Sequence, residues 1–242
     1  MKRAHIVYAH PEPNSFVAAM RDTTRKALES AGWTTSLTDL TRGEFNPVAS
    51  ASDFGTRSRE DYLVYSLEQR HAWRDRSIDP EIAAEVELMC ASDLLVLVFP
   101  VFWYSVPAQM KGWIDRVFLS GVFYGGTRVY DKGGMVGKHA LVVSSLGGRD
   151  YMFAPDGIHG ELNGMLKHLL QGTLGYVGYS VYEPFFAHHV PYVDQDTRSG
   201  MLDKLSRELR ALEQRPTLQM PRLDDFDEEF KRIERANGKV PS

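Results

Sequence analysis

The chain of 242 residues contains a single cysteine, Cys90, and this scarcity excludes two classes of small protein. A framework of intrachain disulfides needs pairs of cysteines, and a cysteine-rich zinc module needs several. The neighbours of Cys90, residues 87–92, have a helical pattern. We expect a lone cysteine in such a segment to be buried in the core.

Long apolar runs and a strong excess of one charge are also missing. No stretch reaches the length of a membrane-spanning helix, and the longest run, Leu94–Trp103, is interrupted by Pro100. The apolar stretch near the N-terminus ends at His10–Pro11, too early for a signal peptide. A net charge of −4 gives no bulk attraction for nucleic acid. We therefore expect a soluble, cytoplasmic protein that binds no nucleic acid and inserts into no membrane.

Apolar residues are plentiful, and they are distributed as in an ordinary globular protein. They make up 43% of the chain, charged residues make up 25%, and 27 residues are aromatic (12 Phe, 11 Tyr and 4 Trp), which excludes disorder as the main state. At roughly 150 residues per domain, the length corresponds to one large domain or two small ones. No internal repeat or second domain is visible.

Short apolar runs alternate with amphipathic stretches along the chain. This pattern predicts strands at 4–9, 34–40, 93–100, 139–145 and 179–186, and helices at 15–31, 79–92, 107–118, 161–174 and 198–212. The run Asp93–Pro100 is apolar almost throughout, which is typical of a parallel strand buried on both faces. The order predicts an α/β fold with a doubly wound, five-stranded parallel sheet in the order 2-1-3-4-5. Residues 43–78 should be partly helical, and Leu223–Ile233 could form a short amphipathic helix.

Ligands of such sheets bind beyond the carboxyl ends of the strands, where three segments should meet. His10–Ser15 opens a capped helix N-terminus, which suits a phosphate. Phe102–Tyr104 supplies three successive aromatic residues, and Gly147–Gly148 lets the backbone approach a flat ligand. Each feature alone is common in proteins without a cofactor, but together they suit a flavin. The chain has neither a Gly-x-Gly-x-x-Gly fingerprint nor a P-loop.

Several motifs resemble those of the NAD(P)H:quinone oxidoreductase family, the DT-diaphorase-like flavoenzymes with a flavodoxin-like fold. The resemblance covers about residues 4–212, and its middle motif is highly specific. The motifs are AHPEPNSF (Ala9–Phe16), ASDLLVLVFPVFWYSVPAQMKGWIDRVF (Ala91–Phe118), YDKG (Tyr130–Gly133), LGG (Leu146–Gly148) and GIHGELN (Gly157–Asn163).

The resemblance implies a flavodoxin-like flavin-binding domain over residues 1–212, followed by a C-terminal tail over 213–242. It also implies an NAD(P)H dehydrogenase (quinone) that acts as a homodimer. Such an enzyme transfers two electrons, as a hydride, from NAD(P)H through the flavin to a quinone or another small acceptor. Because both substrates use one pocket in turn, the kinetics should be ping-pong. The tail and the position of Arg198 favour FAD over FMN.

The resemblance further implies roles for individual residues. His159 matches the catalytic histidine of the family. The substrate pocket, part of which comes from the partner subunit, would include Tyr124, Tyr151, Phe153 and Tyr176. The cofactor-binding residues would be His10, Asn14, Ser15, Phe16, Pro100, Val101, Phe102, Trp103, Tyr104, Leu146, Gly147, Gly148 and Arg198. No metal site is implied, and His188–His189 have no third ligand at a suitable spacing.

The sequence departs from the family at the partner of the catalytic histidine. The best-known members carry a tyrosine where this chain has Phe153, and Tyr151 could replace that tyrosine if the loop is rearranged. Two other functions stay open. Some relatives are flavoprotein regulatory subunits of potassium-efflux systems, and a plain flavodoxin-type electron carrier would share the fold, although the length of this chain argues against a carrier.

Overall fold

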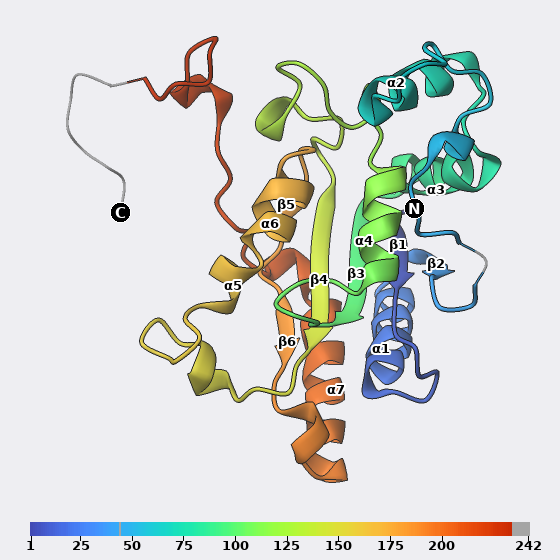
Figure 1. The fold of residues 1–242 in the computed structure, drawn as a ribbon. Helices are drawn as coiled ribbons and strands as arrows, with labels where there is room; N and C mark the ends of the chain where they lie inside the picture. Colours follow the sequence, from blue (N-terminus) through green and yellow to red (C-terminus); the bar gives the residue numbers. More distant parts are fainter. Residues whose placement is uncertain (44, 234–242) are drawn as a thin grey trace.

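The centre of the molecule is one parallel sheet, seen in a computed structural model that describes residues 1–43 and 45–233. Its order is β2-β1-β3-β4-β5, and β6 also pairs with β4 (Figure 1). The predicted fold class and strand order are therefore confirmed. The strands are β1 (Arg3–Tyr8), β2 (Thr34–Asp39), β3 (Leu94–Pro100), β4 (His139–Ser145), β5 (Ser180–Val181) and β6 (Phe185–Ala187).

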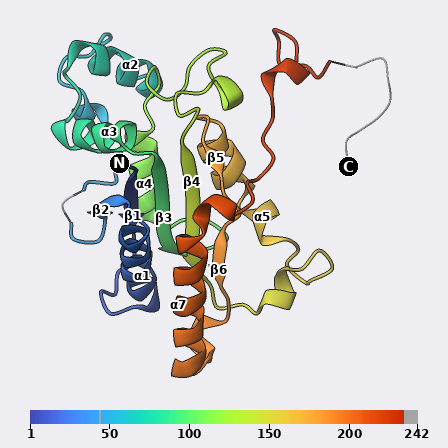
Figure 2. The same cartoon turned by 180° about the vertical axis from the view of Figure 1, so that it is seen from behind.

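Helices cover both faces of the sheet. Helices α1 (Phe16–Ser30) and α7 (Gln195–Arg210) pack on the face seen in Figure 2. Helices α3 (Pro80–Ala91) and α4 (Ala108–Val117) pack on the face seen in Figure 1. Alternate side chains of β3 enter these two cores, Val96 on the α1 side and Leu97 on the α4 side. This explains why the sequence of β3 is a continuous apolar run.

The helix starts follow from local sequence. Ser15 is the N-cap of α1, and its hydroxyl accepts a hydrogen bond from the backbone N–H of Ala18 at 3.1 Å. Asp79 caps α3 in the same way, with Pro80 at the first helical position. The cap at Ser15 agrees with the capped helix start predicted at His10–Ser15, and aspartate is another residue type that favours a helix start. The long segment before α3 is partly helical, as expected, because it contains α2 (Tyr65–Asp75).

Two predicted elements are interrupted. The helix predicted over 161–174 is wrong as a continuous helix: it consists of α5 (Leu162–Met165), α6 (Lys167–Leu169) and a π-helix over Leu170–Gly175. Glycines in this segment weaken a regular helix. The last strand is divided into β5 and β6. Val181 pairs with Ala140 and Phe185 pairs with Val143, so this segment has one residue more than the part of β4 that it lies against. The extra residue and Pro184, which has no N–H, break the ladder between them.

The tail protects the edge of the sheet. The backbone N–H of Leu218 donates to the carbonyl of Val181 at 2.8 Å, and that of Glu183 donates to Pro216 at 2.9 Å. This pairing covers the exposed edge of β5. Leu223–Ile233 is not the expected helix: it contains a 3₁₀ turn over Leu223–Asp225 and an antiparallel bridge between Phe226 and Arg232.

The lone cysteine is also placed differently from the expectation. Cys90 does lie in a helix, α3, but its side chain is on the exposed side near the helix end, so the expectation of a core position is wrong. The sequence prediction failed because the hydrophobic stripe of α3 runs through Ile82, Val86 and Met89. Across residues 1–43 and 45–233, none of the helices has both the length and the apolar character needed to cross a bilayer.

Candidate active site

A tight turn over Phe102–Ser105 follows the carboxyl end of β3. The backbone N–H of each end residue donates to the carbonyl of the other, both at 3.0 Å. Between them, Trp103 and Tyr104 have φ values of 52° and 54°. Two positive φ values in a two-residue hairpin define a type I′ turn, which normally carries Asn-Gly. Bulky residues in this conformation are strained by about 1–3 kcal/mol each, and such strain is concentrated at functional sites.

The turn presents both side chains and backbone donors. The indole of Trp103 is 98% exposed, although an exposed aromatic surface is unfavourable in water. Within the described part of the chain, the backbone N–H groups of Trp103 and Tyr104 donate to no acceptor. The turn therefore offers two free donors beside an aromatic surface, which is what binding of a flat polar ring requires.

Three aromatic side chains meet next to this turn. The hydroxyl of Tyr104 lies 3.1 Å from Nδ1 of His159. The ring of Phe153 lies 5.1 Å from the His159 ring and 6.4 Å from the Tyr104 ring, between centroids. The backbone N–H of His159 donates to Met152 at 3.0 Å, which fixes the loop. Tyr151, by contrast, is 65% exposed, and among the described residues it has neither a ring contact nor a hydrogen bond with His159.

The glycine edge follows β4 and packs against Phe153. A Cβ on Gly148 would lie 2.6 Å from the Phe153 ring, so a side chain there would displace that ring. His189 holds this edge, because its Nδ1 lies 3.0 Å from the Gly147 carbonyl oxygen and its backbone N–H donates to Gly148 at 2.9 Å. Among the residues described, the backbone N–H groups of Gly147 and Gly148 have no acceptor. They form a second pair of free donors, on the strand next to β3.

A second imidazole, that of His188, also packs against Phe153. The ring of His188 is 5.8 Å from the Phe153 ring, and burial lowers the pKa of His188. This histidine is therefore neutral near pH 7. In the parts of the chain that the structure describes, no group of three His, Cys, Asp or Glu side chains is arranged to hold a metal ion.

A cavity of about 350 Å³ lies between the N-terminus of α1 and the start of α7. It brings together Asn14, Ser15 and Phe16 with Arg198, which are far apart in the sequence. Arg198 is held in place because its Nε donates to the Val190 carbonyl at 3.2 Å. A helix N-terminus and an arginine together make a site for phosphate groups. His10 stays within its own turn, where its Nδ1 accepts from the backbone N–H of Glu12.

Tyr124 and Tyr176 form a second aromatic cluster, at the opposite end of the sheet. Their rings lie 5.6 Å apart, and burial raises the pKa of the Tyr124 hydroxyl. They line a groove of about 620 Å³ with Tyr65 and Phe118. Because α4 returns the chain to the start of β4, this groove lies a strand length, about 20 Å, from the carboxyl ends. One chain therefore does not place these tyrosines beside His159.

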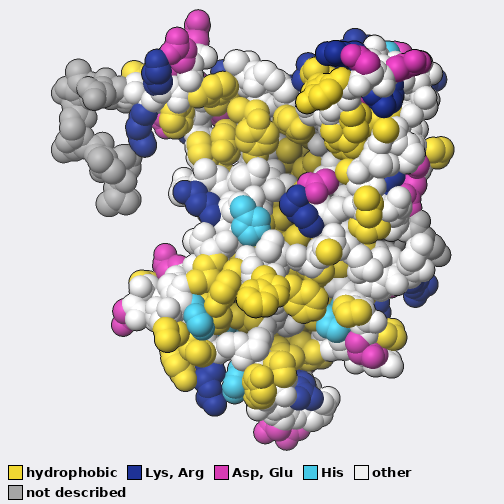
Figure 3. Space-filling model, in the orientation of Figure 1, with side chains coloured by type: hydrophobic (Ala, Val, Ile, Leu, Met, Phe, Trp, Pro, Cys, Tyr) yellow, Lys and Arg dark blue, Asp and Glu magenta, His cyan; other side chains and the backbone are white. Residues whose placement is uncertain are grey.

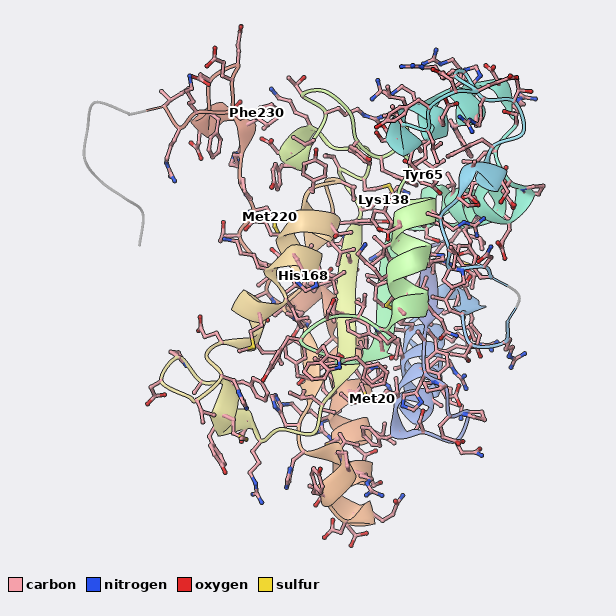
Figure 4. All side chains as sticks on the ribbon, viewed as in Figure 1. Met20, Tyr65, Lys138, His168, Met220 and Phe230 are labelled. Atoms are coloured by element: carbon pink, nitrogen blue, oxygen red, sulfur yellow. The ribbon has the colours of Figure 1, made fainter. Side chains whose placement is uncertain are left out.

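The figures show the same separation. In Figure 1, segment 118–130 lies at the top of the view, and segment 150–160 lies at the lower left. Figure 3 shows apolar side chains gathered in two areas of this face, one above and one below a more polar middle. Figure 4 labels Tyr65 near the upper end of α4 and His168 on the α6 side of the sheet.

His168 is a site residue that the sequence did not reveal. Its Nε2 lies 3.0 Å from the hydroxyl oxygen of Ser105, the last residue of the strained turn, and its Nδ1 lies 3.2 Å from the carbonyl oxygen of Met165. The turn is therefore tied to α6 through a side chain. No spacing or motif signals this contact, because the two residues are 63 positions apart.

Comparison with known proteins identifies the family of this chain. Residues 2–211 match a family model described as flavodoxin-like fold. NAD(P)H dehydrogenase (quinone) 1 of Rattus norvegicus is 32% identical over 232 residues, which cover 96% of this chain and 85% of the relative. Ribosyldihydronicotinamide dehydrogenase (quinone) of Homo sapiens is 32% identical over 212 residues, covering 87% of this chain and 92% of the relative.

A solved structure is similar over the whole chain. The putative quinone reductase from Klebsiella pneumoniae has a TM-score of 0.92 and 27% identity, and the match covers 100% of this chain and 98% of that one. These relatives are quinone dehydrogenases and reductases by name. They give no support to the alternative function, a regulatory subunit of a potassium-efflux system. The chain therefore belongs to the NAD(P)H:quinone oxidoreductase family of flavodoxin-like proteins.

Proposed function

We propose that this protein is a flavin-dependent NAD(P)H:quinone oxidoreductase that works in the cytoplasm in a ping-pong cycle. The observation that carries this proposal is the site beyond β3 and β4: a strained aromatic turn and a glycine edge, each with two free backbone N–H donors, beside His159. The relatives named above support the choice of NAD(P)H as donor and a quinone as acceptor.

The residues present fit a flavin. The free N–H groups of Trp103, Tyr104, Gly147 and Gly148 would hold its polar ring edge, and the first turn of α1 would hold its phosphate. When bound, a flavin accepts a hydride from a nicotinamide and gives it up to a quinone. The protein side chains would supply the surroundings: the rings of Trp103 and Phe153 would shield the bound ring from water, and His159 would donate a hydrogen bond toward negative charge.

The cavity at the start of α7 supports FAD over FMN as the proposed cofactor. The cavity between α1 and α7 extends from Ser15 to Arg198 and Leu202, and its volume of about 350 Å³ exceeds what one phosphate group needs. The guanidinium of Arg198 is suited to the second phosphate or to the adenosine that FAD adds. We therefore propose FAD as the cofactor.

The groove around Tyr124 and Tyr176 supports a homodimer with shared sites. These residues cannot reach His159 of their own chain, so a second copy would have to present them to it. Twofold dimers are also the commonest homo-oligomers. Light scattering after size exclusion should give a dimer, and a fully active monomer would exclude the shared site.

The direct experiment starts with the purified full-length protein. Heating should release a flavin, and chromatography against standards should identify it as FAD. The loaded protein should then reduce menadione with NADPH or NADH, consuming one nicotinamide for each two-electron reduction. Parallel initial-rate lines at varied donor and acceptor would establish the ping-pong order. Absence of a flavin, or accumulation of one-electron products, would contradict the proposal.

A further inference from the structure

The side chain of His159 has one hydrogen-bond partner within the described residues. That partner is the hydroxyl of Tyr104, 3.1 Å from Nδ1, and Nε2 has none. The neighbouring ring, Phe153, carries no hydroxyl, and Tyr151 is exposed to solvent. The hydroxyl that faces His159 therefore comes from the turn after β3 and not from the histidine's own loop.

This contact decides which nitrogen of the imidazole carries the proton. A neutral imidazole has one N–H donor and one acceptor nitrogen. A phenol O–H donates to an unprotonated imidazole nitrogen more readily than it accepts from a protonated one. When Nδ1 accepts from Tyr104, the proton must be on Nε2, which becomes the free donor.

We propose that Tyr104 is the positioning residue of His159, and that its hydroxyl fixes the tautomer with the proton on Nε2. The inference rests on the proposed function, in which that N–H faces the reacting ring. Tyr104 thus has two roles: its backbone N–H holds the edge of the flavin ring, and its hydroxyl fixes the tautomer of His159.

The turn is built to hold this hydroxyl still. Two backbone hydrogen bonds close it, and Ser105 is fastened to His168 on α6. The rings of Tyr104 and Phe153 pack edge to face, 6.4 Å apart. Because Phe153 has no polar group, it offers His159 no competing partner. The backbone of the turn has positive φ values and is closed by hydrogen bonds at both ends, and this restricts the positions that the Tyr104 side chain can take.

Nitrogen-15 NMR of the histidine side chains tests the tautomer directly, with or without bound flavin. His159→Gln assigns the signals by their loss. In the unmodified protein we expect Nδ1 to resonate as an unprotonated nitrogen and Nε2 as a protonated one. Tyr104→Phe should shift both signals toward the average of two exchanging tautomers. Tyr62→Phe, which removes an exposed hydroxyl that contacts no histidine through a hydrogen bond among the described residues, should leave them in place.

Turnover provides an independent measurement. Loss of a neutral hydrogen bond should lower the rate of flavin reduction in Tyr104→Phe by about threefold to tenfold. Adding Phe153→Tyr, which places a hydroxyl on the other aromatic ring packed against His159, should restore part of the rate.

The outcomes test the role of Tyr104 and the proposed enzyme function separately. Unchanged His159 signals in Tyr104→Phe, a proton on Nδ1 in the unmodified protein, or a shift caused by Tyr151→Phe instead would overturn the role of Tyr104. If the unmodified protein holds no flavin or reduces no quinone, the proposed function fails, while the NMR result still decides whether Tyr104 fixes the tautomer.

Discussion

Arg116 and Asp53 form an ion pair that water hardly reaches. Nη2 of the arginine lies 2.9 Å from Oδ1 of the aspartate, and the two side chains are 2% and 1% exposed. Arg116 also donates to Glu81 on α3 at 2.9 Å, and the hydroxyl of Tyr65 donates to Asp53. The network fastens α4 and α3 to the long segment before α2.

Arg116→Met should destabilise the protein by about 3–5 kcal/mol, because Asp53 would be left buried without its counter-charge. Urea unfolding followed by tryptophan fluorescence measures this loss. The control is Arg74→Met, which removes an exposed arginine from α2 and should change stability by less than about 0.5 kcal/mol. A similar small effect for Arg116→Met would show that the buried pair contributes little.

A second buried carboxylate makes stability depend on pH. Burial alone would raise the pKa of Glu85, but hydrogen bonding with His5 and from Thr38 and Trp113 outweighs burial and lowers this pKa. The indole Nε1 of Trp113 donates at 2.8 Å and the hydroxyl of Thr38 at 2.7 Å. A lowered native pKa stabilises the fold above the ordinary glutamate pKa of about 4.3, and the stabilisation is lost as the pH falls below it.

Glu85→Gln should therefore cost about 1–3 kcal/mol near pH 7, because hydrogen bonds to a charged group are replaced by weaker ones. The difference from the unmodified protein should narrow as the pH falls below about 4.3. Denaturant curves at several pH values measure both trends. Glu87→Gln, on the exposed side of α3, is the matched control, and a pH-independent difference for Glu85→Gln would contradict the explanation.

Arg198→Ala tests the adenosine side of the proposed cofactor site. Loss of a charged donor should weaken FAD binding by about tenfold or more and leave FMN binding nearly unchanged. Titration of the flavin-free protein with each flavin, followed by flavin fluorescence, gives both affinities. Arg207→Ala removes an exposed arginine of the same helix and should affect neither. Equal weakening of FAD and FMN would place Arg198 at the shared phosphate instead.

His159→Ala should slow reduction of the flavin by NAD(P)H more than it weakens flavin binding. Loss of one donor to developing negative charge costs about 10²–10³ in rate. Stopped-flow reduction at matched flavin occupancy measures the effect. Phe153→Tyr in the same background should restore part of the rate if its hydroxyl reaches the flavin edge. An unchanged reduction rate would leave His159 with only a structural role.

The sequence predicted the features that neighbouring residues determine. The N-caps Ser15 and Asp79 depend on hydrogen bonds within one turn, and the two-sided burial of β3 is visible in its own apolar run. Strand order then followed from the alternation of strands and helices. The sheet order also indicated which segments meet at the carboxyl ends, and in the structure Asn14–Phe16 and Arg198 line one cavity between α1 and α7.

The sequence could not predict contacts that only the tertiary structure creates. Tyr104 and His159 are 55 positions apart in the sequence, and their contact depends on the relative position of the turn after β3 and the loop after β4. The interruption between β5 and β6 depends on register against β4 and on the tail beside it. The separation of Tyr124 from His159 could not be predicted either, because the family resemblance implied a contribution from the partner subunit without saying which residues make it.

The turn at Trp103 and Tyr104 also affects how the protein can be made more heat-resistant. Asn-Gly at these positions would relieve the left-handed strain, so a selection that scored only survival on heating would favour that exchange. The same exchange would delete the indole and the phenol from the mouth of the site. Laboratory evolution for heat resistance should therefore select variants that carry Asn-Gly at this turn and have lost activity. Gly164, where an added Cβ meets open space, is a position for gaining stability without that loss.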